Sequence, residues 1–360
     1  MTAEERTRDA AFQERMLDGV SRTFALTIPQ LPAPLRPAIG NAYLLCRLAD
    51  TIEDAASLDP DAKREHLQEL VAALETPGAG DTFGARLAPA ITDASDAERE
   101  LVAGAERVFR VFRELPGEQR MPVQRCLAIM ADGMARFAYH KSPAGLQDLP
   151  AFREYCYCVA GVVGEMLTDL FALQVPAIAD DQDAMRRRAV AFGLGLQMTN
   201  ILKDVWDDRQ RGVCWLPRDV FNRHGCALDP DAAWHDSEAF QAGMRELTVM
   251  AHGHLREALR YTRGIPPRHR GIRRFCAWAI GMALYTLKAI HRRPGFTNAQ
   301  QIKLSRARLR GVIVGCNLTV IDDRLLTAAF RWAANGLPAP PRHRSDPMAS
   351  DEDTPWTRTR

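Results

Sequence analysis

Apolar residues recur at intervals of three and four along most of the chain, and no convincing alternation of apolar and polar positions appears. Such intervals place apolar side chains on one face of an α-helix, whereas a half-buried strand needs a period of two. The pattern therefore predicts an all-α fold. The predicted helices span residues 9–20, 35–57, 61–75, 97–113, 118–140, 149–174, 183–209, 237–263, 269–290 and 300–335.

Turn-forming residues separate these helices and mark the end of the folded part. Three prolines between positions 29 and 34 interrupt the chain, and residues 76–81 and 210–235 are predicted loops that contain glycine and proline. Residues 337–360 combine proline with many charges, a composition typical of disorder. We interpret the chain as one helical domain over residues 1–336 followed by a disordered tail over residues 337–360.

Composition narrows the class of protein. Of the 360 residues, 46% are hydrophobic, enough for a large core, and the net charge of +2 predicts no nucleic-acid partner. Eight cysteines without a Cys-x-x-Cys spacing predict buried, reduced thiols. The charged N-terminus lacks the apolar core of a signal peptide, and the longest apolar run, residues 275–287, is shorter than the roughly 18 residues that span a bilayer. We expect a cytoplasmic protein with at most transient peripheral contact with the inner face of a membrane, and no obligate protein partner.

Two predicted helices each carry a pair of aspartates four residues apart, Asp50 with Asp54 and Asp204 with Asp208. No third Asp-x-x-x-Asp occurs in the sequence. Residues four apart lie one turn apart on the same helix face, where two carboxylates repel each other unless a cation lies between them. Two such pairs on facing helices would form an oxygen-only pocket suited to Mg²⁺ and the phosphate groups that it carries.

The first pair belongs to a polar stripe on an otherwise apolar helix. Arg47 precedes Asp50 by three residues, and Asp54 follows four residues later, so the three side chains share one face. Taken alone, the stripe is equally well explained as a solvated helix face with an Arg–Asp pair. The apolar residues on both sides of the stripe indicate burial instead.

The second pair belongs to a longer polar stripe. Spacings of three, four and four place its members on one face of an apolar helix: Gln197, Asn200, Asp204 and Asp208. Burying this stripe without partners would be costly, and a bound metal ion with phosphate would satisfy it. Lys203 and Arg211 would then balance the phosphate charge. The small and apolar residues 192–196, just before the stripe, favour close packing.

A third predicted helix holds tyrosine among small apolar residues. Tyr155 and Val159 share a face, and Ala160 and Gly164 share another, which permits close approach by a neighbouring helix or a ligand chain. A core tyrosine with one hydrogen-bond partner is the alternative interpretation of Tyr155.

Together, these segments resemble the signature segments of the squalene/phytoene synthase family. The resemblance runs from about residue 15 to 335 and rests on four segments in the family's order and separation: Ser-Arg-Thr-Phe at 21–24, and residues 43–54, 155–161 and 197–208. The first and third segments are closest to the squalene synthase form. The stretch Arg-Gly-Val-Cys-Trp-Leu-Pro at 211–217 is more similar to phytoene synthases and many bacterial members.

The resemblance implies an isoprenoid synthase fold, a single-domain helical bundle around a central cavity, in which two allylic diphosphates condense head to head. It implies that the four aspartates bind Mg²⁺ with Asn200 alongside. It also implies catalytic roles for Tyr43, Arg47 and Tyr155, with Tyr155 assisting proton removal. The residues with implied substrate contact are Arg22, Phe24, Arg47, Val159, Ala160, Gln197, Asn200, Lys203, Arg211 and Phe275.

The implied reaction joins two molecules of farnesyl diphosphate through presqualene diphosphate and then reduces the product to squalene with NADPH. Lys303 and Arg306 fall where squalene synthases have basic residues for the cofactor phosphates, although a solvated amphipathic helix explains them equally well. A synthase that stops at presqualene diphosphate, or that makes dehydrosqualene or phytoene, is the alternative. An inert assembly-factor relative is a remote alternative, because such a protein would be free to lose the aspartates that this chain retains.

Two positions depart from the family pattern. Lys203 stands where most members have arginine, which keeps the positive charge but loses bidentate geometry. Gly40 stands three residues before Tyr43, where a bulky residue limits chain length in some relatives. We therefore expect an open cavity floor at Gly40, with a longer substrate as an alternative.

Overall fold

The computed structural model describes residues 2–21, 24–76, 78, 80–230, 233–234 and 236–339. Within these ranges it contains helices, no strand, and one isolated bridge between Leu146 and Pro217. The all-α prediction is confirmed. The predicted tail at 337–360 lies outside the described residues from position 340 onward.

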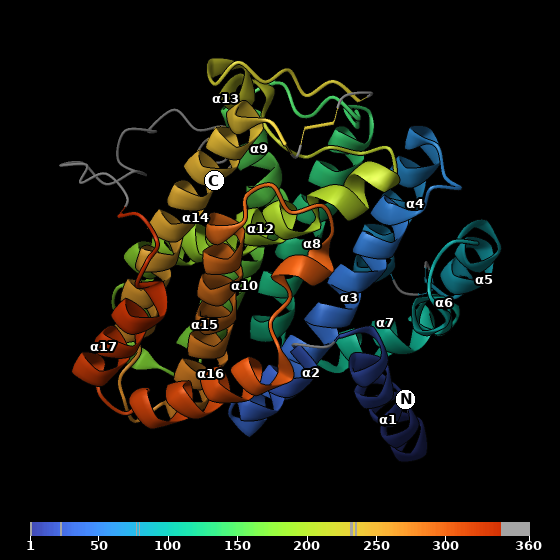
Figure 1. Cartoon of the computed structure of the whole chain (residues 1–360). Helices are drawn as coiled ribbons and strands as arrows, with labels where there is room; N and C mark the ends of the chain where they lie inside the picture. The colour runs from blue at the N-terminus through green and yellow to red at the C-terminus, as the bar shows by residue number, and fades with distance from the viewer. Residues whose placement is uncertain are drawn as a thin grey trace.

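Five long helices form the framework of the bundle. Figure 1 shows α12 in the middle, with α14 and α15 to its left and α8 and α3 to its right, and α12 packs directly on α14, α15 and α10. The long helices are α3 (Arg36–Asp54), α8 (Gly117–Ala138), α12 (Gln182–Gln210), α14 (Glu238–Gly264) and α15 (Arg270–Arg292).

Shorter helices surround this framework. They are α1 (Ala3–Val20), α4 (Pro60–Glu75), α6 (Asp96–Ala103), α7 (Ala105–Glu114), α9 (Leu149–Cys156), α10 (Val162–Ala172), α16 (Arg306–Thr319) and α17 (Asp323–Ala334). The single-turn and two-turn pieces are α2 (Phe24–Thr27), α5 (Phe83–Leu87), α11 (Pro176–Ala179) and α13 (Arg218–Arg223), together with the 3₁₀ turns η1 (Ile28–Gln30), η2 (Ala33–Leu35), η3 (Ala88–Ala90) and η5 (Ala299–Ile302).

Side-chain caps fix several helix starts. Asp148 accepts a hydrogen bond from the backbone N–H of Ala151 at 2.9 Å, which begins α9, and Ser237 begins α14 in the same way. α1 begins earlier than residue 9, the predicted start, because Thr2 and Glu5 form a capping box at Ala3. The sequence held this signal within its first five residues.

Two predictions of a single long helix are wrong, because the chain forms several shorter helices there. The helix predicted over 97–113 divides into α6 and α7 at Gly104, where an added Cβ would lie 2.4 Å from the ring of Phe12. The helix predicted over 300–335 divides into η5, α16 and α17. Its breaks coincide with new N-caps, at Ser305 and at Asp322.

Several short elements were not predicted, among them α2, α5, α11 and the 3₁₀ turns η1 to η3. The helix over 149–174 runs through a π-helical turn, η4 (Tyr157–Gly161), which links α9 to α10. π-turns occur frequently at functional sites. The predicted loop over 210–235 contains the short helix α13.

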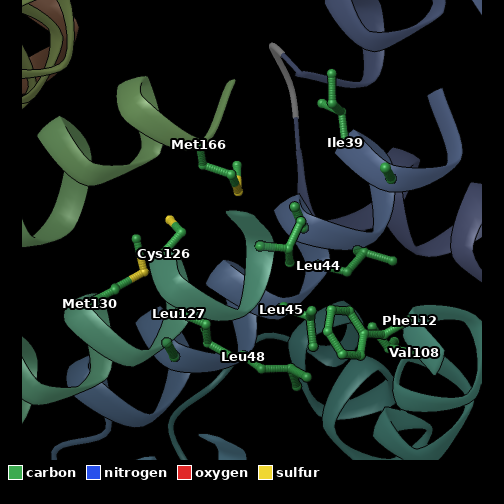
Figure 2. Packing of buried hydrophobic residues seen from close by; sticks show 14 of the residues in the cluster. Ile39, Leu44, Leu45, Leu48, Val108, Phe112, Cys126, Leu127, Met130 and Met166 are labelled. Atoms are coloured by element: carbon green, nitrogen blue, oxygen red, sulfur yellow. The ribbon is translucent and has the colours of Figure 1, made fainter. Parts of the chain in front are cut away.

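The core around α3 leaves one face of that helix for other partners. Leu44, Leu45 and Leu48 are completely buried. Figure 2 shows these side chains between the apolar side chains of α7 and α8, with Met166 of α10 nearby. Packing against both neighbours fixes the rotation of α3, so the face that carries Arg47 and Asp50 points away from this core.

Close backbone contacts join α12 to the segment that carries η4. A Cβ on Gly193 would lie 2.3 Å from the carbonyl oxygen of Ala160, and a Cβ on Gly164 would lie 2.3 Å from that of Ala189. Only glycine fits at these two positions. The close packing predicted for the Ala160–Gly164 face and for residues 192–196 is therefore confirmed.

One helical stretch within the described residues is long and apolar enough to cross a membrane. Leu149–Ala172 has a window of mean hydropathy 1.2, but 61% of that window is buried inside the bundle. A core helix of a soluble protein passes the same test, so the stretch is weak evidence for a membrane span.

Candidate active site

A cavity of about 720 Å³ lies between α2, α3, η4, α10, α12 and α15. Charged side chains from α3 and from the C-terminal part of α12 line one part of the cavity. Apolar side chains line another part, and they are Phe24, Ile28, Ile39, Met166, Phe171, Phe192, Phe275 and Ala279. The cavity therefore combines a region for charge with a region for a hydrocarbon chain.

The cavity brings together most of the predicted site residues from five separate segments. Those that line it are Phe24, Tyr43, Arg47, Asp50, Asp54, Tyr155, Val159, Ala160, Gln197, Asn200, Lys203, Asp204, Asp208, Arg211 and Phe275. Arg22 lies outside the described residues. Lys303 and Arg306 are exposed and do not belong to the lining.

α3 positions the first polar stripe as predicted. The Arg47 guanidinium donates to the Tyr43 hydroxyl at 3.0 Å and lies 3.8 Å from the Asp50 carboxylate. The Tyr43 hydroxyl in turn donates to the backbone carbonyl of Val20 at 3.3 Å. Tyr43 and Arg47 are thus held as one unit beside Asp50.

Burial and neighbouring charges shift the pKa values of Asp50 and Arg47. Burial raises the pKa of Asp50 to about 6 against the attraction of Arg47, and the Asp54 carboxylate raises it further. Burial alone would lower the pKa of Arg47, but Asp50 and Tyr43 outweigh that effect and raise it. The Arg47 and Asp50 side chains are 27% and 37% exposed and line the cavity, whereas the Asp54 side chain is 58% exposed, so the stripe runs from a half-buried part to a solvated end.

α12 positions the second stripe across the cavity. Lys203 lies 3.1 Å from Asp204, whose pKa burial raises. Only 10% of the Asp208 side chain is exposed, and burial raises its pKa to about 6 despite the adjacent Arg211. Both aspartates thus occupy a setting that favours an added positive charge.

Arg211 connects the two aspartate pairs. Its guanidinium lies 2.5 Å from the Asp208 carboxylate of α12 and 3.6 Å from the Asp54 carboxylate of α3. Arg211 is the C-cap of α12, and Gly212 follows with a φ of +74°, a backbone conformation that favours glycine. The predicted meeting of the two pairs on facing helices is confirmed, with an arginine between them.

The carboxylates suit Mg²⁺ that takes part of its ligands from water and from the substrate. Across the described part of the chain, no group of three or more His, Cys, Asp or Glu side chains converges on a point that could hold a metal ion. Mg²⁺ usually binds through one or two carboxylates and takes its remaining ligands from water and substrate phosphates. The two oxygen-only pairs fit that mode, and they do not form an all-protein cage.

Glu53 is a cavity residue that the sequence interpretation missed. Burial raises its pKa to about 8 against the attraction of Lys141, and its Oε1 atom is buried without a hydrogen-bond partner. Lys63 and Lys141 both donate to the Glu53 backbone carbonyl, each at 2.7 Å, and so cap the end of α3. The position of Glu53 three residues after Asp50, on the same side of the helix, could have identified it from the sequence.

Tyr155 lies between an aromatic ring and a carboxyl group. Its ring stacks on Trp215, with centroids 3.9 Å apart and 8° between the planes, and its hydroxyl donates to Glu53 at 3.4 Å. Burial and the Glu53 carboxylate hold the pKa of Tyr155 well above its ordinary value. The phenol is therefore a hydrogen-bond donor. Trp215 was not among the predicted site residues, although it lies in the stretch 211–217 that resembles phytoene synthases.

Aromatic rings line the apolar part of the cavity. Phe24 lies between Tyr43, at a centroid distance of 5.0 Å, and Phe275, at 6.1 Å. Phe171 meets Phe275 edge to face at 6.1 Å. The faces and edges of these rings present π-electron density and no strong nucleophile to a bound chain.

Gly40 does not open the cavity floor, so that expectation is wrong. Gly40 does not belong to the cavity lining, and a Cβ at this position would lie 3.2 Å from the Leu17 side chain of α1. The adjacent Ile39 lines the cavity instead. One residue along a helix turns the side chain by about 100°, which is why a sequence offset of one position misleads.

Comparison with known sequences gives one consistent group of relatives. The family model described as squalene/phytoene synthase matches residues 17–308. Squalene synthase of Schizosaccharomyces pombe is 28% identical over 318 residues, which cover 87% of this chain and 66% of the relative. Squalene synthase of Mus musculus is 27% identical over 82% of this chain and 66% of the relative. The chain thus spans about two thirds of the length of these relatives.

Comparison with solved structures supports the fold. TcSQS in complex with the ligand BPH1237 has a TM-score of 0.71 at 23% identity, covering 92% of this chain and 94% of that one. A dehydrosqualene synthase in complex with a ligand has a TM-score of 0.61 at 23% identity, covering 87% and 96%. Squalene synthase HpnC from Alicyclobacillus acidocaldarius has a TM-score of 0.57 at 20% identity, covering 82% and 98%.

Proposed function

The chain belongs to the squalene/phytoene synthase family, and we propose that it is an enzyme that joins two molecules of farnesyl diphosphate head to head. One observation carries this proposal above the others. The two aspartate pairs, linked through Arg211, share a single cavity with a wall of aromatic and aliphatic side chains. Such a cavity suits a substrate with a diphosphate at one end and a hydrocarbon chain at the other.

The charged part of the cavity would hold the diphosphate of the ionising substrate. Asp50, Asp54, Asp204 and Asp208, with Asn200 alongside, would hold Mg²⁺, and the bound ion would neutralise the diphosphate and make it a good leaving group. Arg211 already lies between the two pairs, where it would contact the same phosphates. Arg47 would do so from α3, because the Tyr43 hydroxyl fixes its guanidinium.

The carbon–oxygen bond of the first substrate breaks, and the electron pair leaves with the diphosphate. The double bond of the second substrate attacks the resulting allylic cation, and loss of a proton closes a cyclopropane, giving presqualene diphosphate. Phe24 and Phe275 would shield the cation from water and stabilise it through their π faces.

Tyr155 would orient the reacting groups through its hydroxyl proton. Because its phenol stays protonated, the released diphosphate is the better acceptor for the proton that leaves the cyclopropane carbon. Stacking on Trp215 would hold the hydroxyl in place. Tyr155 thus assists proton removal indirectly, by donating a hydrogen bond.

We propose squalene as the product, with NADPH as the hydride donor for the second half-reaction. The similarity to squalene synthases supports this product. Lys303 and Arg306 are exposed and do not line the cavity that holds the aspartates. Their predicted contact with the cofactor phosphates stays a prediction, and their position outside the cavity gives no separate support for it. Presqualene diphosphate, dehydrosqualene or phytoene stay as alternative products.

The deciding experiment is an incubation of the purified protein with farnesyl diphosphate and Mg²⁺, with and without NADPH. Squalene that forms only with NADPH supports the first proposal, whereas presqualene diphosphate in both samples supports an enzyme that stops there. Product from geranylgeranyl diphosphate alone would overturn the assignment of chain length. No product from either substrate would favour an inert relative.

Aspartate variants test the cavity itself. Asp50→Ala and Asp204→Ala should each abolish formation of the cyclopropyl product while circular dichroism stays unchanged. Asp132→Ala, a carboxylate that is 71% exposed on α8 and outside the cavity, is the matched control and should keep full turnover. Turnover that persists in both cavity variants would contradict the proposed diphosphate site.

A further inference from the structure

The charges of this chain are distributed unevenly. Residues 258–321 contain no aspartate or glutamate but 13 lysines and arginines, although the whole chain has 45 acidic residues and a net charge of only +2. This segment includes α15 and α16 and reaches the turn before α17. A strong asymmetry of this kind indicates an anionic partner, which nucleic acids and membrane surfaces both provide.

Large apolar side chains are exposed on the same part of the molecule. Five of the nine exposed large hydrophobic residues in the described ranges lie on α16, on α17 or in the turn between them. Their exposed fractions are Val314 56%, Leu318 65%, Ile321 45%, Leu325 47% and Trp332 72%. We refer to these five side chains as the α16–α17 surface.

Helical spacing gathers these side chains into outward stripes. Val314 and Leu318 are four residues apart on α16, and Leu325 and Trp332 are seven apart on α17, so each pair shares a helix face. The outer side of α16 is open, since an added Cβ at Gly311 or Gly315 meets nothing within 4 Å.

Buried residues on the inner faces show that these helices are already anchored. Val312 of α16 and Leu326, Phe330 and Ala333 of α17 are buried, and both helices pack on α15. The α16–α17 surface is therefore additional apolar area that the fold does not need for its own core. Exposed apolar side chains that gather on one part of a protein often mark a surface used for binding.

Arginines accompany the apolar stripes, and the nearby acids are already engaged. Asp322 caps α17, and Asp323 lies 2.6 Å from the buried Arg273. The Arg308 guanidinium lies over the ring of Tyr285, which also meets Trp332 edge to face. The exposed arginines of α16 and α17 are Arg306, Arg308, Arg310, Arg324 and Arg331.

We propose that the α16–α17 surface docks the protein on a membrane that contains anionic lipid. The arginines would contact the lipid phosphates, while the aliphatic side chains and the indole of Trp332 would enter the interfacial layer. A nucleic acid would satisfy the arginines but would leave Val314, Leu318 and Leu325 in water. The proposal rests on charge and exposure, and it does not depend on the proposed reaction.

Vesicle binding by the full-length protein tests this surface. We expect co-sedimentation with vesicles of phosphatidylcholine and phosphatidylglycerol, and binding at least tenfold weaker to phosphatidylcholine alone. The double variant Leu318→Glu with Trp332→Glu should lose binding to both. Met121→Glu, which changes a 71% exposed residue of α8 outside this surface, is the matched control and should bind like the unmodified protein.

Arginine variants separate charge from apolar insertion. Arg310→Gln and Arg324→Gln should each weaken binding to the anionic vesicles by roughly fivefold, leave the weak binding to neutral vesicles unchanged, and reduce the dependence on salt. Unchanged binding in the double glutamate variant would overturn the proposal, provided its melting temperature stays normal.

A second copy of this chain is the competing occupant of the surface. If sedimentation shows a concentration-dependent dimer that the Leu318→Glu and Trp332→Glu changes abolish, and vesicles do not bind, the surface is an interface between copies. Binding of short duplex DNA at the same affinity as the anionic vesicles would also overturn the proposal. Turnover in detergent solution should stay unchanged in all these variants, because none of the altered residues lines the cavity.

Discussion

The phenol ring of Tyr155 lies almost flat on the indole of Trp215, with ring centroids 3.9 Å apart and an angle of 8° between the planes. The ammonium group of Lys141 lies 5.5 Å from the centroid of the same indole and also donates to the backbone carbonyl of Glu53. A single contact chain thus connects the end of α3 to the tyrosine. The position of the Tyr155 hydroxyl should depend on Trp215.

Replacing Trp215 by leucine should lower kcat without a comparable rise in KM. The substitution removes the stacking partner, so Tyr155 gains rotational freedom while the diphosphate region stays intact. We expect kcat for presqualene diphosphate formation to fall about tenfold, and Tyr155→Phe, which keeps the ring and removes the donor, to cost roughly a hundredfold. Steady-state kinetics measures both.

The matched control for this prediction is Trp278→Phe. Trp278 is also buried, but its indole N–H donates to Asn317 and it does not line the cavity. Its turnover should stay within about twofold of the unmodified protein. Wild-type kcat in Tyr155→Phe would show that the hydroxyl has no part in the reaction.

Arg211 should compete with a bound metal cation for the aspartate carboxylates. It should also help to bind the diphosphate of the substrate. Replacing Arg211 by methionine removes a positive charge 2.5 Å from Asp208 and 3.6 Å from Asp54. We therefore expect Mn²⁺ or Mg²⁺ to bind roughly threefold to tenfold more tightly in the absence of substrate, because the guanidinium is half exposed and its effect is screened. The KM for farnesyl diphosphate should rise about tenfold.

Titration calorimetry with the metal alone and steady-state kinetics measure the two effects separately. Arg223→Met is the control, since Arg223 pairs with Glu246 at 2.7 Å on the protein surface and lies outside the cavity. Metal binding that weakens in Arg211→Met, or a KM for farnesyl diphosphate that does not rise, would contradict the proposed double role.

Gly193 should be required for the shape of the cavity wall. A Cβ at this position would lie 2.3 Å from the Ala160 carbonyl oxygen, so Gly193→Ala must push η4 away from α12. We expect a loss of about 1–3 kcal/mol in the free energy of unfolding, together with reduced turnover, because Val159 and Ala160 line the cavity. Urea denaturation and product assays measure these quantities.

Gly315→Ala tests the same substitution where space is available. An added Cβ there meets nothing within 4 Å, and the residue lies inside α16. Alanine should then stabilise the protein by up to about 1 kcal/mol, through its higher helix propensity. Equal effects of the two substitutions would contradict the close contact between α12 and η4.

The parts of the site that follow from helical periodicity could be predicted from the sequence. Asp204 and Asp208 share a helix face because they are four residues apart. Each of the two helices buries its apolar side, so the polar faces that carry the two aspartate pairs can meet although the pairs are far apart in the sequence. Arg211 could be placed near them only as a nearby cation. Its contact with Asp54 depends on the turn at Gly212 and on packing between distant helices.

The features that could not be predicted depend on tertiary contacts. Gly104 separates α6 from α7, and the ring of Phe12, 92 residues earlier, leaves no room for a side chain at this position. Trp215 lines the cavity because its loop, which has no helical periodicity, packs back onto the bundle. There the backbone carbonyl of the adjacent Leu216 accepts a hydrogen bond from the N–H of Leu146. Neither contact has a local signature in the sequence.

Chain length should be controlled from α15, and not from position 40. Ala279 lines the cavity one turn after Phe275, so Ala279→Phe would fill space that the hydrocarbon chain needs. We expect kcat/KM to fall at least tenfold for farnesyl diphosphate and less for geranyl diphosphate, whose chain is five carbons shorter. Gly40→Ala is the control, since its new methyl group meets only the flexible end of Leu17. If Gly40→Ala changes the preference between the two substrates and Ala279→Phe does not, the cavity ends at α3 and not at α15.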